Sequence, residues 1–447
     1  MRVLHTSDWH LGQYFYGKSR ADEHQHFMNW LLNTIKANQV QLLIVAGDIF
    51  DTGTPPSYAR ALYNQFIVDM QQTGCELLIL GGNHDSVSTL AESQALLSYL
   101  NTHVVPGGFS EPEQHVLTMG MESQPQALVC ALPFLRARDL ISSEAGESGV
   151  DKQHKLSLAI AHYYQHCFDH ALKLKQQILA EQGVSVPIIA TGHLTTVGAS
   201  SSESVRDIYI GSLDAFNAAH FPAADYIALG HIHRMQIVAK SEHIRYCGSP
   251  IPLSFDELPA DQLQSGKHVL LVEFEQDKLK QVQPIAIPLF QPMRAIKGNL
   301  QEIEQLVEEL VKQLIGQLAM QSDANETNQQ PLNTWLSVEV VEQDYLTDLQ
   351  GRIAKIVADK PVEVLQLTRA RKQRHSANPS HNETLAEINV ADVFERRLAL
   401  ESFETEQEQA RRERVSLQFK RIAQQVESQL NHEQHPDLTE LQERVKS

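Results

Sequence analysis

The sequence has few cysteines, no long apolar run and no excess of positive charge, and each absence excludes a class of protein. Its four cysteines lie far apart, so we expect reduced core side chains rather than disulfides or a zinc knuckle. No apolar stretch is long enough to span a bilayer, and no membrane association is expected. The net charge of −18 argues against a protein that holds nucleic acid through its overall field. A nucleic-acid substrate would therefore depend on local basic patches or on a partner.

A secretion signal is also not expected. The residues from Arg2 to Ser7 already have the pattern of a buried strand, so the fold begins at once and a cytoplasmic location is expected. At 447 residues, of which 42% are hydrophobic, the chain is too long for one ordinary domain. Two or three globular domains are expected.

Five short apolar stretches end abruptly in polar residues. The clearest runs from Leu42 to Ala46 and stops at Gly47 and Asp48. Five aliphatic or small residues in succession are typical of a strand that is buried on both faces, as in a parallel sheet. Open α/β sheets keep their functional sites just past the carboxyl ends of such strands. The polar residues at the five ends are Asp8 and His10, then Asp48, then Asn83, His84 and Asp85, then His193, and finally His231 and His233.

These side chains have the composition of a centre for two divalent metal ions. Two such ions about 3.5 Å apart can hold a phosphate ester, polarise it and activate a water at neutral pH. The pair needs one carboxylate that reaches both ions, and we expect Asp48 to be this bridge. The other expected ligands are Asp8, His10 and His233 for one ion and Asn83, His193 and His231 for the second.

His84 directly follows a predicted ligand but is expected to face the scissile phosphate rather than an ion. We expect it to stabilise the transition state and to protonate or orient the leaving oxygen, with Asp85 fixing the tautomer of its ring. Any one of these residues alone would be a weak signal, because the chain contains 21 histidines and Gly-Asp is a common turn. The ordered set, each member placed after an apolar strand, is specific.

The domain organisation follows from changes in pattern along the chain. Residues 1–280 alternate strands and helices and are expected to form an α/β sandwich flanked by helices. After Pro284 and Pro288 the character changes, and residues 281–375 are expected to form a small α+β domain with its own core. Residues 376–389 are expected to be a linker.

The C-terminal segment, residues 390–435, is expected to be helical. From 391 to 435 it has neither glycine nor proline, and apolar residues recur at steps of three and four along one face. These residues are Val415, Phe419, Ile422, Val426 and Leu430. The helices either fold back on the main body or, as we favour, dock on a partner helix. Residues 436–447 are expected to be a tail.

The five motifs, in this order, resemble those of the calcineurin-like metallophosphoesterase superfamily. Within it, the run from Asp8 to Gly12 and the three runs 47–51, 81–85 and 230–233 resemble the nuclease subunits of SMC-type DNA repair complexes. The resemblance covers nearly the whole chain, as a phosphoesterase domain, a capping domain and terminal helices in that order. It implies a metallophosphoesterase-type β-sandwich flanked by helices.

This resemblance also implies an activity and partners. The activity would be a Mn²⁺-dependent DNA exonuclease and endonuclease, acting at double-strand ends and hairpins. An SMC/ABC-type ATPase would be gripped by the C-terminal helices, in a heterotetramer that contains two nuclease chains. We expect helices around Ala59 to Gln72 and Ala91 to Leu100 to pair these chains. Such an enzyme would be cytoplasmic and associated with the nucleoid.

Two positions distinguish this chain from other branches of the superfamily. Several relatives have histidine where this chain has Asp51, so Asp51 is expected to lie outside the ligand set or on the substrate side. Purple acid phosphatases have a tyrosine ligand shortly after Gly-Asp, and the run from Gly47 to Asp51 has none. That difference disfavours a mixed-valent iron site. Mn²⁺ is the expected metal, and the sequence does not distinguish it from Mg²⁺, Zn²⁺ or Fe.

Candidate substrate contacts follow the first motif. Tyr14, Lys18 and Arg20 combine aromatic and basic groups suited to DNA backbone and end contacts. Alternatively, this segment is an aromatic-rich loop that packs on its neighbours. Arg136 and Arg138 are further candidates for contact with phosphate.

Two other functions are compatible with the same ligands. A small-molecule phosphodiesterase or phosphatase needs the same centre, but it has little use for a capping domain and a partner-binding helix. A binding module with a dead metal site is disfavoured by the intact Asp48, Asn83 and His84. With these two alternatives disfavoured, we expect the function that the resemblance implies, a metal-dependent DNA nuclease that works with an ATPase in double-strand-break processing and hairpin cleavage.

Overall fold

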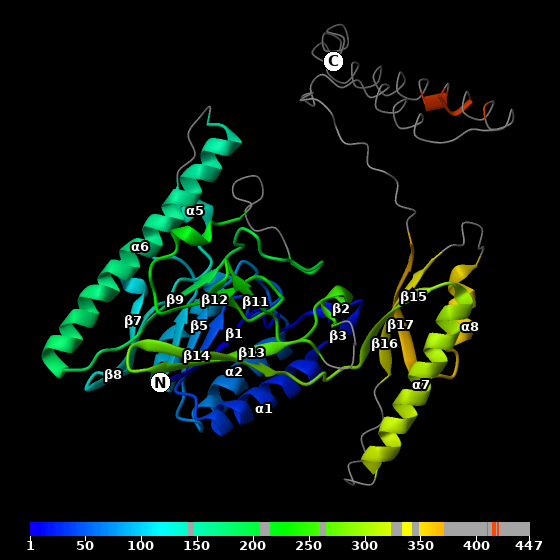
Figure 1. Ribbon diagram of the computed structural model, residues 1–447, viewed down its shortest axis with the longest axis horizontal. Helices are drawn as coiled ribbons and strands as arrows, with labels where there is room; N and C mark the ends of the chain where they lie inside the picture. The colour runs from blue at the N-terminus through cyan, green and yellow to red at the C-terminus, as the bar shows by residue number, and fades with distance from the viewer. Residues whose placement is uncertain are drawn as a thin grey trace, which may run out of the picture. The chain divides into compact units, whose positions relative to one another are not determined.

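The computed structural model describes residues 1–141, 147–205, 215–259, 265–322, 333–341 and 348–370, and a few positions between 409 and 419. The chain divides into two units, Met1–Ala370 and Arg371–Ser447, and the features below belong to the first (Figure 1). The predicted linker at 376–389 and the tail at 436–447 lie outside the described residues. Of the predicted partner-binding segment, only positions 409, 414–416, 418 and 419 are described, and these are helical.

Two six-stranded sheets form the body of the first unit. The first sheet has the order β14-β13-β1-β4-β5-β6, and the second has the order β11-β12-β10-β9-β8-β7. The strands of the first are β1 (Arg2–Thr6), β4 (Leu42–Ala46), β5 (Glu76–Leu80), β6 (Thr102–Val105), β13 (His268–Glu275) and β14 (Lys278–Ala286). Those of the second are β7 (Val116–Met121), β8 (Gln124–Cys130), β9 (Ile188–His193), β10 (Tyr226–Gly230), β11 (Gln236–Val238) and β12 (Ser241–Tyr246).

The centre of each sheet is parallel. In the first sheet β1, β4, β5 and β6 run together and β13 pairs antiparallel with β1, with β14 outside it. In the second sheet β12, β10, β9 and β8 run together between the antiparallel edges β11 and β7. The carboxyl ends of the parallel strands of each sheet therefore lie along one edge, as the strand-end motifs require.

Helices cover the outer face of each sheet, which gives four layers and agrees with the predicted sandwich (Figure 1). The helices α1 (Ala21–Asn38) and α2 (Ser57–Met70) pack on the first sheet, and α6 (Gly149–Gln182) packs on the second. β4 shows why its sequence is apolar throughout. Leu43 and Val45 face α1 and α2, whereas Leu42, Ile44 and Ala46 face the second sheet.

Short elements complete this domain. They are β2 (Tyr14–Phe15), β3 (Lys18–Ser19), α3 (Val87–Ala91), α4 (Gln94–Leu97), η1 (Ser98–Leu100), η2 (Pro112–His115), α5 (Ala137–Leu140), η3 (Ala218–His220) and η4 (Phe255–Glu257). All four cysteines are buried and free, as expected. Among the described helices, none is both long enough and apolar enough to cross a membrane.

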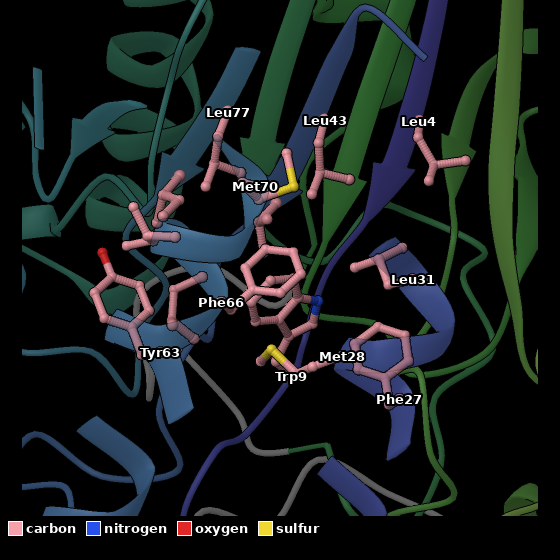
Figure 2. Close-up of a cluster of buried hydrophobic side chains, with 14 of the residues drawn as sticks. Leu4, Trp9, Phe27, Met28, Leu31, Leu43, Tyr63, Phe66, Met70 and Leu77 are labelled. Atoms are coloured by element: carbon pink, nitrogen blue, oxygen red, sulfur yellow. The ribbon is translucent and has the colours of Figure 1, made fainter. Parts of the chain in front are cut away.

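Trp9 anchors the loop that follows β1. Its indole packs edge-on against Phe27 of α1 and Phe66 of α2, with ring centroids 5.8 and 5.2 Å away (Figure 2). Its Nε1 donates to Thr6 Oγ1 at 3.1 Å, so the polar atom of this fully buried ring is satisfied. Because Trp9 stands between Asp8 and His10, its burial fixes the turn that carries both.

A second, smaller domain follows the sandwich. Its parallel sheet has the order β15-β16-β17, and two helices connect the strands. The elements are β15 (Met293–Gly298), α7 (Leu300–Ser322), β16 (Thr334–Val340), α8 (Leu349–Val357) and β17 (Val362–Arg369). Its core is formed by apolar residues of both helices and all three strands. This is the position of the predicted capping domain.

The predicted boundary at residues 280 and 281 lies within β14, so the sandwich extends to Ala286. β14 is an edge strand whose residues are exposed or half-buried, and it contains Pro284. An edge strand does not need a continuous apolar pattern, and it tolerates a proline that an inner strand would not. Its sequence therefore does not mark it as a strand of the first domain.

The two domains meet at a small aromatic cluster. Phe15 stacks on Trp335 at 5.7 Å between centroids, and the Arg20 guanidinium lies 5.0 Å from the Phe15 ring and 5.6 Å from the Trp335 ring. Arg20 also pairs with Glu23 through two nitrogens and donates to the Pro252 carbonyl at 2.8 Å. Arg20 has no exposed surface. It is therefore a structural residue of the domain joint and not the DNA contact that the sequence suggested.

We expect Arg20→Ala to destabilise the protein by about 3–5 kcal/mol, because it leaves the buried Glu23 carboxylate without its partner. Urea unfolding followed by tryptophan fluorescence measures this change. Arg138→Ala is the matched control, since its side chain is 77% exposed, and it should leave the unfolding midpoint in place. Unchanged stability combined with weaker DNA binding in Arg20→Ala would restore Arg20 as a DNA contact.

Candidate metal centre

The ends of five strands, three from the first sheet and two from the second, carry the predicted ligands into one buried site. Three groups of ligand atoms occur there, each with all its atoms within 4.8 Å of one another. They are Asp8 with His10 and His233, Asp48 with His193 and His231, and His10 with Asp48 and His84. The first group is the set predicted for one ion, and the second contains Asp48 with two of the three residues predicted for the other ion. The third group shares His10 with the first and Asp48 with the second. Their use as metal ligands stays a prediction.

The backbone of this site is strained. Asp8, His10, Asp48 and His231 have positive φ values of 55°, 47°, 51° and 93°. Residues with a side chain adopt this region at a cost on the order of 1–3 kcal/mol each, and such residues gather at functional sites. The packing of the sandwich holds them in place.

Two glycines allow the strand ends to approach one another. A Cβ atom on Gly82 would lie 2.1 Å from Asp48 Oδ1, and a Cβ atom on Gly230 would lie 1.9 Å from the carbonyl oxygen of Ala46. The first glycine brings the β5 end against Asp48, and the second brings β10 of one sheet against β4 of the other. Any larger residue would separate the two groups of ligands.

Hydrogen bonds turn the predicted histidine ligands inward. Nδ1 of His193 lies 2.9 Å from the Ala46 carbonyl, and Nδ1 of His10 lies 3.2 Å from Asp51 Oδ1. A carbonyl only accepts, so Nδ1 of His193 donates and Nε2 of the neutral ring keeps its lone pair. The Asp51 carboxylate accepts from His10 in the same way, and its place outside the ligand set stays a prediction.

Atoms of the kinds that bind metals converge inside the site. Asn83 Oδ1 lies 2.9 Å from His193 Nε2 and 3.1 Å from His231 Nδ1, and Asp48 Oδ2 lies 3.2 Å from His193 Nε2. Nε2 of His10 and Nε2 of His231 are buried without a hydrogen-bond partner. Carboxylate, amide and imidazole donors around unsatisfied nitrogens fit two divalent ions of the Mn²⁺, Fe²⁺ or Zn²⁺ type.

Burial and neighbouring charges set the protonation states of the same groups. Burial would lower the pKa of His193, but the Asp48 carboxylate raises it to about 9. Burial would raise the pKa of Asp48, but His193 and His10 hold it well below its usual value. Burial, together with His193, holds the pKa of His231 well below its usual value. Asp48 is therefore anionic and His231 neutral, which are the forms that bind metal, and a metal at His193 would displace a proton.

Asp85 does not fix the tautomer of His84, contrary to expectation. The nitrogen Nδ1 of His84 lies 2.8 Å from the backbone carbonyl of Asp51, which sets the tautomer instead. The Asp85 carboxylate accepts hydrogen bonds from the backbone N–H groups of Ile49, Phe50 and Gly82 at 2.8–3.1 Å. The Asp85 carboxylate is bonded to these peptide N–H groups rather than to the neighbouring His84 ring. It therefore holds the loops after β4 and β5 together.

The predicted substrate residues differ in their exposure and in their contacts. Tyr14 is 59% exposed on the β2–β3 hairpin, directly after the first motif. Lys18, also on this hairpin, pairs with Glu363 of β17 at 2.6 Å. Arg136 is half-buried and donates to the Asp85 carbonyl at 3.2 Å, whereas Arg138 is exposed.

The structure adds a buried network that sequence reasoning missed. Glu257 and Lys267 form a buried ion pair next to His233, and Ser202 and Ser204 join it. Burial opposes ionisation of Glu257, but Lys267 holds its pKa well below the usual value. These residues come from three separate loops without a motif, so only the serine-rich run after β9 offered a signal.

Comparisons with known proteins agree with this geometry. The family model described as calcineurin-like phosphoesterase matches residues 1–235, and the one described as type 5 capsule protein repressor C-terminal domain matches residues 289–402. The chain is 50% identical to the SbcD component of the nuclease SbcCD of Escherichia coli (strain K12), over 92% of this chain and 95% of that protein. It is 34% identical to the SbcD component of the nuclease SbcCD of Rhodobacter capsulatus, over 58% of this chain and 64% of that protein.

Among solved structures, a dimetal phosphatase from Danio rerio aligns with 64% of this chain and 98% of its own, at 11% identity and a TM-score of 0.34. This score is too low to bear on the fold or the function of the chain.

We expect Gly82→Ala to weaken Mn²⁺ binding by about 10–100-fold, because the added Cβ would displace the Asp48 carboxylate. Calorimetric titration of the metal-free protein with Mn²⁺ measures the change. Gly53→Ala is the matched control near the site, since its Cβ would make an ordinary contact 3.5 Å from Ser86. Equal affinity in the two variants would exclude Asp48 as a ligand.

Proposed function

The chain belongs to the calcineurin-like phosphoesterases and, within them, to the family of the SbcD component of the nuclease SbcCD; from this premise we propose that it is a Mn²⁺-dependent DNA nuclease. Its activities would be exonucleolytic on double-strand ends and endonucleolytic on single strands and hairpins, in double-strand-break processing. The observation that carries this proposal is the pair of ligand groups joined by a third group, which holds His10 of the one and Asp48 of the other, in a chain that aligns along 95% of a nuclease subunit.

In the proposed mechanism the predicted ligands form two sets, one for each ion. Asp8, His10 and His233 would hold one ion and Asn83, His193 and His231 the second, with Asp48 between them. Two divalent ions supply polarisation of the phosphodiester and activation of the attacking water. The chain's own contribution is a rigid cradle, in which buried groups are oriented before substrate arrives.

We propose that His84 acts on the leaving group. Its backbone N–H donates to Asp48 Oδ1 at 2.9 Å, and Nδ1 is held by the Asp51 carbonyl. In the protonated ring, Nε2 carries the second proton, which the leaving oxygen would take up as the P–O bond breaks. The edge of the His10 ring packs on His84 at 4.8 Å between centroids and limits its rotation.

A DNA substrate is supported by the surface beside the site. Tyr14 and Tyr16 are 59% and 50% exposed on the hairpin that follows His10, and Lys18 lies on the same hairpin. Aromatic side chains stack on bases, and cationic ones contact the backbone, even where the overall charge is negative. With four free cysteines, these features favour a cytoplasmic, nucleoid-associated enzyme.

We further propose two protein contacts. The segment 390–435 would bind an SbcC-type SMC/ABC ATPase, because its apolar stripe suits a coiled coil and the related nuclease is by name one part of SbcCD. A second copy of the chain would pair through α2 and the α3–η1 region. Exposed Val68, Leu96 and Tyr99 lie there, beside a groove of about 330 Å³ lined by Tyr63 and Leu90 among others.

Cleavage of an end-labelled DNA hairpin with Mn²⁺, with and without an SbcC-type ATPase and ATP, tests the nuclease proposal. We expect cleavage that strengthens with the ATPase. Turnover of a small phosphodiester only, without response to the ATPase, would make the chain a small-molecule phosphodiesterase.

The same assay tests the role of His84. His84→Gln should abolish cleavage and retain both metals, because it removes the proton donor and keeps the ligands. Loss of metal in His84→Gln would make His84 a ligand.

Sedimentation of the full chain tests the pairing. We expect a dimer that Leu96→Lys dissociates, because a charge would be buried in the apolar contact. Leu179→Lys is the control, since Leu179 is 50% exposed on α6 of the other sheet. A monomer in the parent chain at all concentrations would refute the proposed pairing.

A further inference from the structure

Glu257 is a buried carboxylate that the proposed chemistry does not use. It is 7% exposed and lies at the end of η4. It accepts from Ser202 Oγ at 2.8 Å and from the Leu253 N–H at 3.0 Å, and it contacts Ser204 Oγ. Lys267 Nζ pairs with it and also donates to the His233 carbonyl at 2.8 Å. These contacts all lie around one predicted metal ligand, His233.

Stability alone is a poor reason for such a network. A buried ion pair costs desolvation of both charges, and a packed apolar pair of similar volume is often as stable or more stable. Lys267 is 4% exposed, so its ammonium is fully enclosed as well. The buried charges therefore indicate a functional role, beyond stability, that involves the groups they contact.

The positions of the protons follow from the atoms available. The Glu257 carboxylate can only accept, because Lys267 keeps it ionised. Ser204 has a single hydroxyl proton, and its Oγ contacts both Glu257 Oε1 and His233 Nδ1, the latter at 2.6 Å. If the hydroxyl donates to Glu257, the remaining contact requires His233 Nδ1 to donate to Ser204 Oγ. The direct distance from His233 Nδ1 to Glu257 Oε1 is 3.5 Å, which is too long for a good hydrogen bond.

From this chain of contacts we infer that Glu257 is a positioning residue for His233, and that it acts through the hydroxyl of Ser204. The relay places the proton of the neutral ring on Nδ1 and leaves the Nε2 lone pair for the ion shared with Asp8 and His10. Carbonyl and carboxylate acceptors do the same directly for His193 and His10. The inference rests on the metal site of the proposed function.

A purely structural role is the alternative. Glu257 closes the turn that begins at Ser254, and Phe255 of this turn is buried with Phe15, Met293 and Trp335 at the domain joint. Loss of Glu257 could therefore loosen the joint rather than the ligand. Ser204 separates the two roles, because it contacts His233 and Glu257 but belongs to the loop after β9 and not to this turn.

The test compares Ser204→Ala and Glu257→Gln with Ser200→Ala, an exposed position in the same loop. Mn²⁺ titration of the full chain by calorimetry should resolve two binding steps. In Ser204→Ala and Glu257→Gln we expect one step to weaken by about 10–100-fold and the other to stay unchanged. Ser200→Ala should match the parent in both steps. Excess Mn²⁺ should restore phosphodiesterase activity in Ser204→Ala.

Nitrogen NMR of the metal-free protein provides a readout that needs neither metal nor DNA. The His233 ring should be protonated on Nδ1 in the parent chain and should become a mixture of tautomers in Ser204→Ala, with the melting temperature unchanged. Unaltered tautomer and Mn²⁺ affinities in Ser204→Ala would overturn the inference. Equal weakening of both steps with a lower melting temperature would assign Glu257 to the joint. If the parent chain failed to cleave DNA but showed two metal steps, the nuclease proposal would fail while the inference stood.

Discussion

The burial of the Asp48 carboxylate between two sheets is the constraint on which the site depends. An ionised carboxylate removed from water is costly unless it is paired and hydrogen-bonded. Here it accepts from the His84 N–H and lies beside His193 and His10, and its own backbone is held at φ 51°. Gly82 and the histidines from the second sheet serve to enclose this one carboxylate.

The sandwich supplies the rigidity that such a site requires. Strained backbone at Asp8, His10 and Asp48 persists only where surrounding packing over-determines it. Trp9 provides that packing from between α1 and α2 (Figure 2). Asp85 adds to it by tying two loops together. Apolar packing and backbone hydrogen bonds thus hold the polar centre in place.

Apolar packing also supports the polar site where the second domain joins the sandwich. The joint between the domains is built from Phe15, Trp335 and the buried Arg20, immediately beyond the loop that carries His10. On the far side of that joint, η4 brings Phe255 to the aromatic cluster and Glu257 to the neighbourhood of His233. The candidate metal centre and the second domain are therefore connected through a few residues of the η4 turn, and the exposed tyrosines lie on the β2–β3 hairpin that carries Phe15.

The sequence by itself determined where the strands end and which side chains stand at those ends. Apolar runs and the residues that stop them are local, so Asp8, Asp48 and His193 could be placed on strand ends from their neighbours alone. The tertiary structure decided everything that depends on distant partners. Ser204 lies 29 residues from His233 in the chain, and Pro252 lies 232 residues from Arg20. No local pattern records such contacts, which is why Arg20 resembled a surface cation, Asp85 a partner of His84, and the end of β14 the start of the second domain.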